Sequence, residues 1–289
     1  MDRSKENPIT TAQAVEKHVT VNGVRLRYLD WGTAGKTPLI CLHGHCLHAN
    51  TWDEFAEAMS SDYHVMALDQ RGHGESEWAD TGYARDRFVE DLTAFADALD
   101  LRKFALAGLS MGGWNSLLYT ADHPERVERI VMVDIAPEPG AAQMALMVDR
   151  PPTPMEFQTV DAAVEWMRQG NPWASDASLR KDAEHKLRRQ SDGGWTWKAD
   201  PALFNVALPD MTDSGLIGRY WSALEQIPCP ILEVRGGESL MVSDEVIQRM
   251  GEVGKQFSSV DVAGAGHVVT LDKPAEFVQA TRSFFGVPA

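Results

Sequence analysis

The chain has 289 residues, of which 44% are hydrophobic, and its formal net charge is −15. This length and apolar content are typical of a globular protein with one large α/β domain or two smaller domains. The negative charge disfavours binding to nucleic acid or to anionic membrane surfaces, since both require a basic face. No stretch approaches the roughly 18 apolar residues of a membrane-spanning helix.

The polar, aperiodic residues 1–14 are predicted to form a loose tail, and they lack the apolar segment of a signal peptide. Three cysteines fit free thiols in a reducing compartment better than a disulfide framework. We therefore expect a cytoplasmic protein, either a monomer or a homodimer. Its partner is expected to be a small molecule, with no nucleic acid and no membrane.

The first half of the chain alternates between predicted strands and helices. Strands at 17–20 and 24–29 flank Asn22-Gly23, a dipeptide that favours a two-residue hairpin turn. The pattern continues with strands at 38–42, 63–68, 103–107 and 127–134, and with helices at 52–59, 87–99 and 114–121. This alternation predicts a mostly parallel sheet with helices on both faces.

After Ile135 the alternation stops, and it resumes near Ile231. The intervening segment is rich in proline and has helices predicted near 156–168, 177–189 and 213–226. A strand near 231–234, a helix near 244–250, a strand near 259–262 and a helix near 274–285 follow. We predict a core of residues 1–136 and 228–289, interrupted by a helical cap, residues 137–227. Four tryptophans of this cap could line an apolar pocket or pack within the cap: Trp166, Trp173, Trp195 and Trp197.

Residues Gly108–Gly113 read Gly-Leu-Ser-Met-Gly-Gly and lie between a predicted strand and a predicted helix. The pattern G-x-S-x-G in this context places a serine on a sharp, strained turn. Glycines are favoured there because side chains would clash as the backbone reverses. Ser110, at a helix N-terminus, is therefore a candidate nucleophile.

Other polar residues also follow predicted strands, where ligands bind in an open parallel sheet. They are His43-Gly44-His45, residues 69–76, Asp134 and Gly264-Ala265-Gly266-His267. Because histidine titrates near neutral pH, His267 on its glycine-flanked loop is a candidate base for Ser110.

These motifs occur in the same order as in the α/β-hydrolase fold family, which the chain resembles from about residue 15 to 285. They are His43-Gly44, Asp-x-Arg-Gly-His-Gly-x-Ser at 69–76, the serine turn, and Gly-x-Gly-His ending at His267. The resemblance implies an α/β-hydrolase fold, with a mostly parallel eight-stranded sheet, helices on both faces and a helical cap. It also implies that Ser110 is the nucleophile and His267 the general base.

The same resemblance implies an oxyanion hole made by the backbone N–H groups of His45 and Met111. It implies no metal and no organic cofactor. Five possible metal ligands lie between residues 41 and 48: Cys41, His43, His45, Cys46 and His48. We do not predict a metal site there, because Cys41 belongs to a buried strand and no C-x-x-C spacing is present.

The acid departs from the usual family pattern. Most members carry it after the strand that follows the cap, in a loop resembling Gly-x-x-Asp, but here Ser239 stands at that position. A serine cannot stabilise an imidazolium as a carboxylate does. Three carboxylates could replace it: Asp134, Glu238 and Asp244. Asp134 is favoured because it preserves the chain order serine, acid, histidine, Glu238 is the alternative, and Asp244 is expected to cap the next helix.

This acid placement is similar to that of a subgroup represented by (E)-2-(acetaminomethylene)succinate hydrolase. The resemblance implies a serine hydrolase that cleaves a carboxylic ester of a small organic molecule through an acyl-enzyme. An activated amide, a C–C bond or perhydrolysis are alternatives within the same fold. A non-catalytic small-molecule receptor is the alternative from a different class. Ser110 disfavours dehalogenases and epoxide hydrolases, which use an aspartate nucleophile.

Overall fold

The computed structural model describes residues 13–32, 35–140, 142, 144–145, 152–205 and 212–287. The predicted tail, residues 1–14, lies outside the described residues except for Gln13 and Ala14. None of the helices in these described ranges is long and apolar enough to cross a bilayer.

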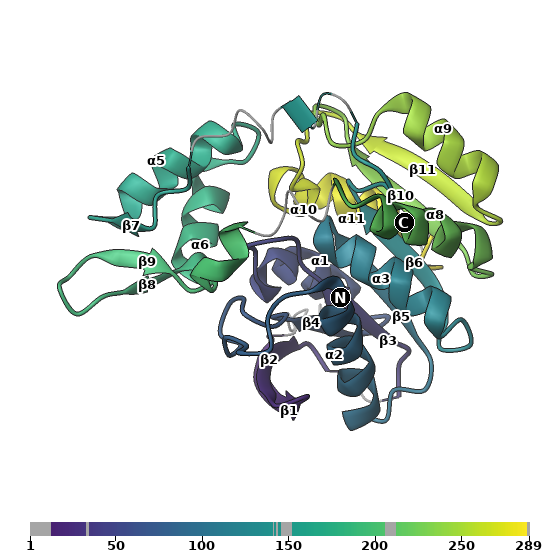
Figure 1. Ribbon diagram of the computed structural model, residues 1–289, viewed down its shortest axis with the longest axis horizontal. Helices are drawn as coiled ribbons and strands as arrows, with labels where there is room; N and C mark the ends of the chain where they lie inside the picture. The colour runs from purple at the N-terminus through teal and green to yellow at the C-terminus, as the bar shows by residue number, and fades with distance from the viewer. Residues whose placement is uncertain are drawn as a thin grey trace, which may run out of the picture.

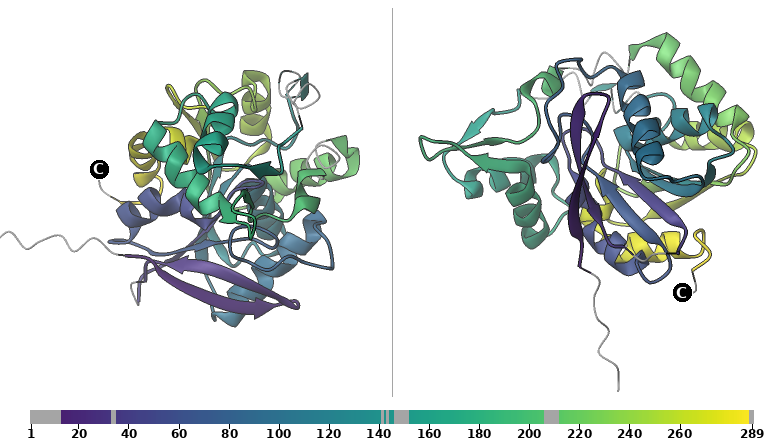
Figure 2. Two further views of the ribbon diagram at one scale, coloured as in Figure 1. Left: turned by 90° about the vertical axis from the view of Figure 1, so that its left-hand side faces the viewer. Right: turned by 90° about the horizontal axis from the view of Figure 1, so that it is seen from below.

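The fold is built on an eight-stranded sheet in the order β1-β2-β4-β3-β5-β6-β10-β11 (Figures 1 and 2). Strands β1 and β2 pair antiparallel, β2 and β4 also pair antiparallel, and all other neighbours are parallel. This confirms the predicted mostly parallel sheet. Its strands are β1 Val15–Val21, β2 Val24–Asp30, β3 Pro38–Leu42, β4 His64–Leu68, β5 Phe104–Leu109, β6 Val127–Val133, β10 Ile231–Gly236 and β11 Phe257–Val262.

The hairpin between β1 and β2 forms where the sequence predicts it. Asn22 and Gly23 both have positive φ, 49° and 77°. A two-residue turn of this type requires positive φ at both positions, which asparagine and glycine adopt more readily than other residues.

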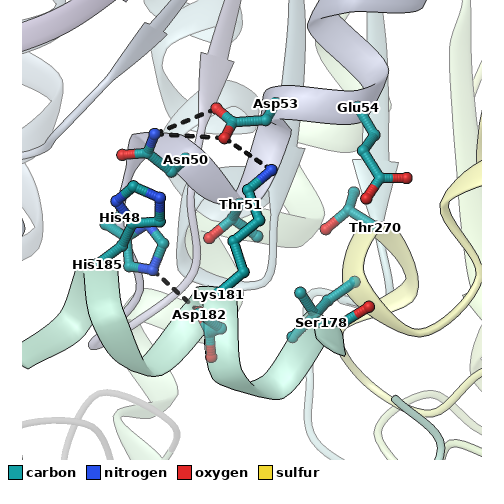
Figure 3. A pocket seen from close by; sticks show the side chains of 11 residues that line it. His48, Asn50, Thr51, Asp53, Glu54, Ser178, Lys181, Asp182, His185 and Thr270 are labelled. Atoms are coloured by element: carbon teal, nitrogen blue, oxygen red, sulfur yellow. Dashed lines mark hydrogen bonds and ion pairs between the residues drawn. The ribbon is translucent and has the colours of Figure 1, made fainter. Parts of the chain in front are cut away.

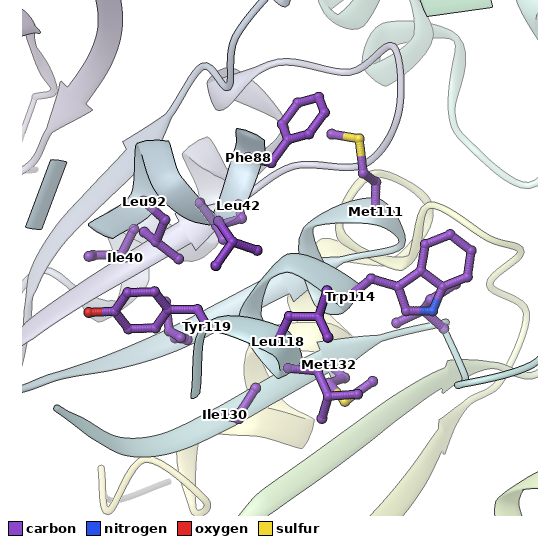
Figure 4. Packing of buried hydrophobic residues seen from close by; sticks show 14 of the residues in the cluster. Ile40, Leu42, Phe88, Leu92, Met111, Trp114, Leu118, Tyr119, Ile130 and Met132 are labelled. Carbon is purple, nitrogen blue, oxygen red and sulfur yellow. The ribbon is translucent and has the colours of Figure 1, made fainter. Parts of the chain in front are cut away.

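Helices cover both faces of the sheet because alternate strand residues point to opposite sides. Leu39 and Cys41 of β3 belong to one buried cluster, together with residues of α1 and α11. Ile40 and Leu42 belong to a second buried cluster on the other face, together with residues of α2, α3, α8 and α9. Figure 4 shows the second cluster, in which side chains of α2 and α3 gather over β3 and β6. The helices of the core are α1 Asp53–Met59, α2 Arg85–Ala98, α3 Met111–Asp122, α8 Ser214–Gln226, α9 Asp244–Val253, α10 Val269–Asp272 and α11 Pro274–Arg282.

One predicted helix cap is wrong, that of the helix after β10. At α9 the cap is Ser243, whose Oγ accepts from the Val246 N–H at 3.4 Å, and Asp244 is the first helical residue. Asp244 therefore stabilises that helix N-terminus by its charge rather than as the cap.

Between β6 and β10 the chain forms a smaller unit that Figure 1 shows to one side of the main sheet. Its described elements are β7 Glu156–Phe157, α5 Val160–Gly170, α6 Asp176–Lys186, β8 Leu187–Arg189, β9 Trp195–Trp197 and a 3-10 turn, Pro201–Asn205. Strands β7, β9 and β8 form an antiparallel sheet that the sequence analysis did not predict. The end of the predicted helix 177–189 pairs instead with Trp195–Trp197, because the chain reverses at Gly193, which has φ 93°. The start of the predicted helix 156–168 pairs with the other edge of Trp195–Trp197.

This smaller unit has a buried cluster of its own, which includes Phe157, Met167, Leu179 and Trp197. Trp166 packs against Trp197 with ring centroids 5.8 Å apart, so these two tryptophans stabilise the unit from within. Helix α8 lies in the range predicted as cap, but it packs on the main core rather than within the smaller unit. Its Tyr220 stacks on Trp114 of α3 at 5.1 Å, and its buried face joins the main core.

Candidate active site

Ser110 lies on the turn between β5 and α3, as the sequence predicts. Its backbone has φ 50° and ψ −117°, which is a strained conformation for a residue with a side chain. The turn is possible because glycines surround it. A Cβ on Gly112 would lie 2.1 Å from the Leu42 carbonyl oxygen, and one on Gly108 would lie 2.3 Å from the Gly112 carbonyl oxygen. The serine is therefore held at the carboxyl edge of the sheet by backbone packing that no larger residue permits.

Asp134 and His267 meet at the same edge. Asp134 follows β6 with φ 50°, and its side chain is fully buried. His267 lies in the loop after β11, and its Nδ1 is 2.7 Å from Asp134 Oδ2. Because a carboxylate only accepts hydrogen bonds, Nδ1 carries the hydrogen and Nε2 presents a lone pair. This is the tautomer that a general base requires.

Asp134 is fixed by two further donors. The Gly236 N–H donates to Oδ1 at 3.0 Å, and the Ser239 hydroxyl donates to Oδ2 at 2.5 Å. Ser239, the residue at the usual position of the family's acid, therefore contacts the displaced carboxylate directly. The loop position of Ser239 is evident from the sequence, but its hydrogen bond to Asp134 is not.

The other two candidate acids lie elsewhere. The Glu238 side chain is exposed, and Asp244 forms an ion pair with Arg235 at 2.5 Å. Within the described part of the chain, no hydrogen bond or ion pair joins either carboxylate to His267. The geometry therefore brings only Asp134, of the three, to the histidine.

The two predicted oxyanion donors flank Ser110. Met111 is the first residue of α3, where a backbone N–H has no acceptor within the helix. The turn that carries His45 packs against the serine, since a Cβ on Gly44 would lie 3.2 Å from Ser110 Cβ. Among the described residues, no hydrogen bond joins Ser110 Oγ to His267.

A buried polar network ties the His45 turn to α3. His43 Nδ1 donates to the Gly44 carbonyl at 2.7 Å, and its Nε2 accepts from the Gln70 N–H at 3.0 Å. The Gln70 side chain donates to the His43 carbonyl at 2.8 Å and accepts from Asn115 of α3 at 2.6 Å. Burial lowers the pKa of His43 to about 4, so the ring is neutral at physiological pH. The network holds the predicted oxyanion turn in one position.

The model of the alpha/beta hydrolase fold family matches residues 37–274, which is most of the chain. The chain belongs to this family. This α/β hydrolase is 28% identical over 279 residues to a 3-hydroxybutyrate-oligomer hydrolase of Cupriavidus necator, covering 91% of this chain and 93% of that protein. It is 27% identical to an esterase of Mycobacterium tuberculosis, covering 88% of this chain and 84% of that protein.

A third relative is 2-(acetamidomethylene)succinate hydrolase of Mesorhizobium japonicum, which is 24% identical over 96% of this chain and 97% of that protein. A crystal structure of E-2-(acetamidomethylene)succinate hydrolase superimposes with a TM-score of 0.82, covering 95% of this chain and all of that chain. The structural comparison confirms the fold.

Two residues of the smaller unit, Asn171 and Trp173, connect to the loop that bears His267, Asn171 through Asp272 of α10 and Trp173 directly. Asp272 Oδ2 accepts from the Gly266 N–H at 2.8 Å, and its Oδ1 accepts from the Asn171 side chain at 2.7 Å. The Trp173 ring lies against Gly266, where a Cβ would be 2.2 Å from Trp173 Cε3. Asp272 is not among the predicted site residues. Its only signal in the sequence is a carboxylate five residues after His267.

Replacement Asp272→Asn is expected to change how stability depends on pH. Burial raises the pKa of Asp272 to about 6, above its ordinary value of 3.8. Between these pH values the folded protein holds a proton that the unfolded chain has lost, so this group's contribution to stability falls as pH rises from about 4 to 6. The effect is on the order of 3 kcal/mol at most, and Asp272→Asn removes it.

The measurement is the free energy of unfolding of both proteins in urea at several pH values between 4 and 7. The variant should gain stability relative to the unchanged protein as pH rises. A difference that stays flat over this range would contradict the assignment.

A small pocket lies at a second junction between the core and the smaller unit, and Figure 3 shows its side chains. His48 Nε2 is 2.9 Å from Asp182 of α6, and both side chains are buried. Lys181 pairs with Asp53 of α1 at 3.0 Å. None of the predicted site residues lines this pocket, and the two contacts at its wall join α6 to the core.

Proposed function

We propose that this α/β hydrolase cleaves a carboxylic ester of a small organic molecule through an acyl-enzyme. Ser110 is the nucleophile, His267 the general base and Asp134 the acid of the triad. The observation that carries the proposal is the 2.7 Å hydrogen bond between His267 Nδ1 and buried Asp134, next to a serine on a strained turn. A histidine in this tautomer, oriented by a carboxylate, can accept a proton from serine.

In the first half-reaction, Ser110 Oγ attacks the ester carbonyl carbon while His267 Nε2 takes the hydroxyl proton. The backbone N–H groups of His45 and Met111 bind the oxyanion, each contributing about 3 kcal/mol to transition-state stabilisation. Asp134 stabilises the imidazolium that forms. His267 then gives the proton to the leaving alkoxide, and the acyl group remains on Ser110.

In the second half-reaction, His267 takes a proton from water, and the hydroxide attacks the acyl carbon. The Ser110 oxygen leaves and recovers its proton from His267, so one water is consumed and an acid and an alcohol are released.

We further propose that residues 137–227 include the lid of this site. The separate buried cluster of α5, α6 and the small sheet supports a unit that packs on its own. The contact of Trp173 with Gly266 of the His267 loop, and that of Asn171 with Asp272, which binds the same loop, support its position over the site. Helix α8 supplies the connection back to the core, because its buried face packs on α3.

Two relatives support an ester as the substrate, since one is a 3-hydroxybutyrate-oligomer hydrolase and one an esterase. An activated amide is the second candidate, which the relative that hydrolyses 2-(acetamidomethylene)succinate favours. Initial rates on a panel of p-nitrophenyl esters of graded acyl length, beside acidic amide substrates, separate the two. The proposal expects turnover of at least one ester.

A fluorophosphonate probe should label Ser110 in the folded protein, because the probe reports a serine whose proton is removed by a neighbouring base. Mass spectrometry of the digested adduct identifies the labelled residue, and heat-denatured protein serves as the control. Folded protein that remains unlabelled at Ser110 would exclude the enzyme and favour a non-catalytic receptor.

A further inference from the structure

Two histidines and a cysteine meet beside the predicted oxyanion turn. One ligand atom from each of His45, Cys46 and His73 lies within 4.8 Å of the other two. His45 and Cys46 follow β3, whereas His73 comes from the loop after β4, so the fold brings two separate motifs together. A thiolate and two imidazoles are ligands that suit Zn²⁺ and other transition metals.

His73 has the arrangement expected of a metal ligand. Its side chain is fully buried, and Nδ1 is 2.8 Å from the Arg71 carbonyl oxygen. A carbonyl oxygen only accepts, so Nδ1 carries the hydrogen and Nε2 carries the lone pair. Among the described residues Nε2 has no hydrogen-bond partner. A buried acceptor nitrogen without a partner is unusual in a folded protein.

His45 is oriented in a related way. Its Nε2 is 2.9 Å from the Leu203 carbonyl oxygen, so Nε2 carries the hydrogen and Nδ1 is the lone-pair nitrogen. Ligating histidines commonly donate their other N–H to a backbone carbonyl in this manner, which fixes the tautomer and the ring. The neighbouring His43 lies outside the cluster, and its two ring nitrogens bind within the polar network described above.

We propose that His45, Cys46 and His73 form a binding site for a divalent transition metal such as Zn²⁺. The metal replaces the proton of the Cys46 thiol, which is released to solvent, and the two neutral imidazoles contribute lone pairs. A fourth position is left to water, as in zinc sites with three protein ligands. In tetrahedral geometry the ligand atoms lie about 3.3–3.6 Å apart, so the three atoms draw together on binding.

The site has a consequence for the proposed ester hydrolysis. His45 supplies both a metal ligand through its ring and an oxyanion donor through its backbone N–H. Because the ring and this N–H belong to one residue, ligation of the ring is expected to displace the N–H. We therefore expect the bound metal to inhibit ester hydrolysis, and this part of the inference rests on the proposed function.

Isothermal titration of the metal-free full chain with ZnCl₂, in the presence of a phosphine reductant, tests the site without any substrate. One equivalent should bind, with release of about one proton measured in buffers of different ionisation enthalpy. Cys46→Ser should weaken the affinity at least about tenfold. Cys229→Ser is the matched control, since Cys229 is a free, buried cysteine that precedes β10 and is not part of the cluster, and this variant should bind Zn²⁺ as the unchanged protein does.

Two further measurements keep the result decisive. Circular dichroism shows whether Cys46→Ser is folded, and Cys46→Ala replaces it if it is not. With Co²⁺ as the probe, a thiolate-to-metal absorption band should appear in the unchanged protein and disappear in the Cys46 variant. Equal Zn²⁺ affinity in the Cys46 and Cys229 variants would overturn the proposal. Failure of ester hydrolysis alone would leave metal binding intact, so the two proposals fail separately.

Discussion

Replacement Ser110→Ala is expected to reduce kcat for the best ester by about a million-fold. Loss of a serine nucleophile has an effect of this size, because the remaining groups act only through it. Stability should change little, since alanine differs from serine at this position only by the hydroxyl oxygen. The measurement is initial-rate kinetics, together with the free energy of unfolding.

Ser222→Ala is a suitable control, because Ser222 lies on α8 and its hydroxyl contacts only Gln226 in the described contacts. This variant should keep kcat within about a factor of two. Residual activity of Ser110→Ala at a tenth of the original rate would exclude an acyl-enzyme on this serine.

Replacement Asp134→Asn is expected to reduce kcat by about ten thousand-fold. The amide group can donate to His267 Nδ1, which favours the tautomer whose lone pair faces the wrong way, and it no longer stabilises the imidazolium. KM should change much less than kcat, because Asp134 is buried behind the histidine rather than exposed to substrate. Steady-state kinetics over a range of pH measure both quantities.

Glu238→Gln is the matched control, since it also converts a carboxylate to an amide in the region of the site. Its side chain is exposed and makes no described contact with His267, so kcat should change by less than about threefold. If the two variants ranked in the opposite order, the acid would be Glu238 and the assignment of Asp134 would be wrong.

Sequence patterns predicted the centre of the main sheet well because β3, β4 and β5 are buried on both faces. The continuous apolar run of Pro38–Leu42 forms a strand with the predicted bounds. The serine turn was also predictable, because Gly108 and Gly112 are required by backbone contacts that any residue with a Cβ would break. Such local steric requirements leave a clear signature in one sequence.

The features that sequence patterns did not predict depend on contacts between segments that are distant in the sequence. The strand Trp195–Trp197 is short and stable only through pairing with β7 and β8, so no local periodicity reveals it. The hydrogen bond from Ser239 to Asp134 joins residues 105 positions apart. The meeting of His73 with His45 and Cys46 likewise requires the β3 and β4 loops to lie side by side, which composition alone does not indicate.

The hydrogen bonds of Asp272 connect the smaller unit to the His267 loop, two parts of the molecule that would move relative to each other if the smaller unit opened. Its two oxygens hold Asn171, at the end of α5, and the backbone of the His267 loop. If α5 swings away to admit a substrate, the carboxylate loses one partner while it still holds the loop of the base. Entry of the substrate and alignment of His267 would then be coupled. A ligand too bulky for α5 to return to its position would bind without being hydrolysed.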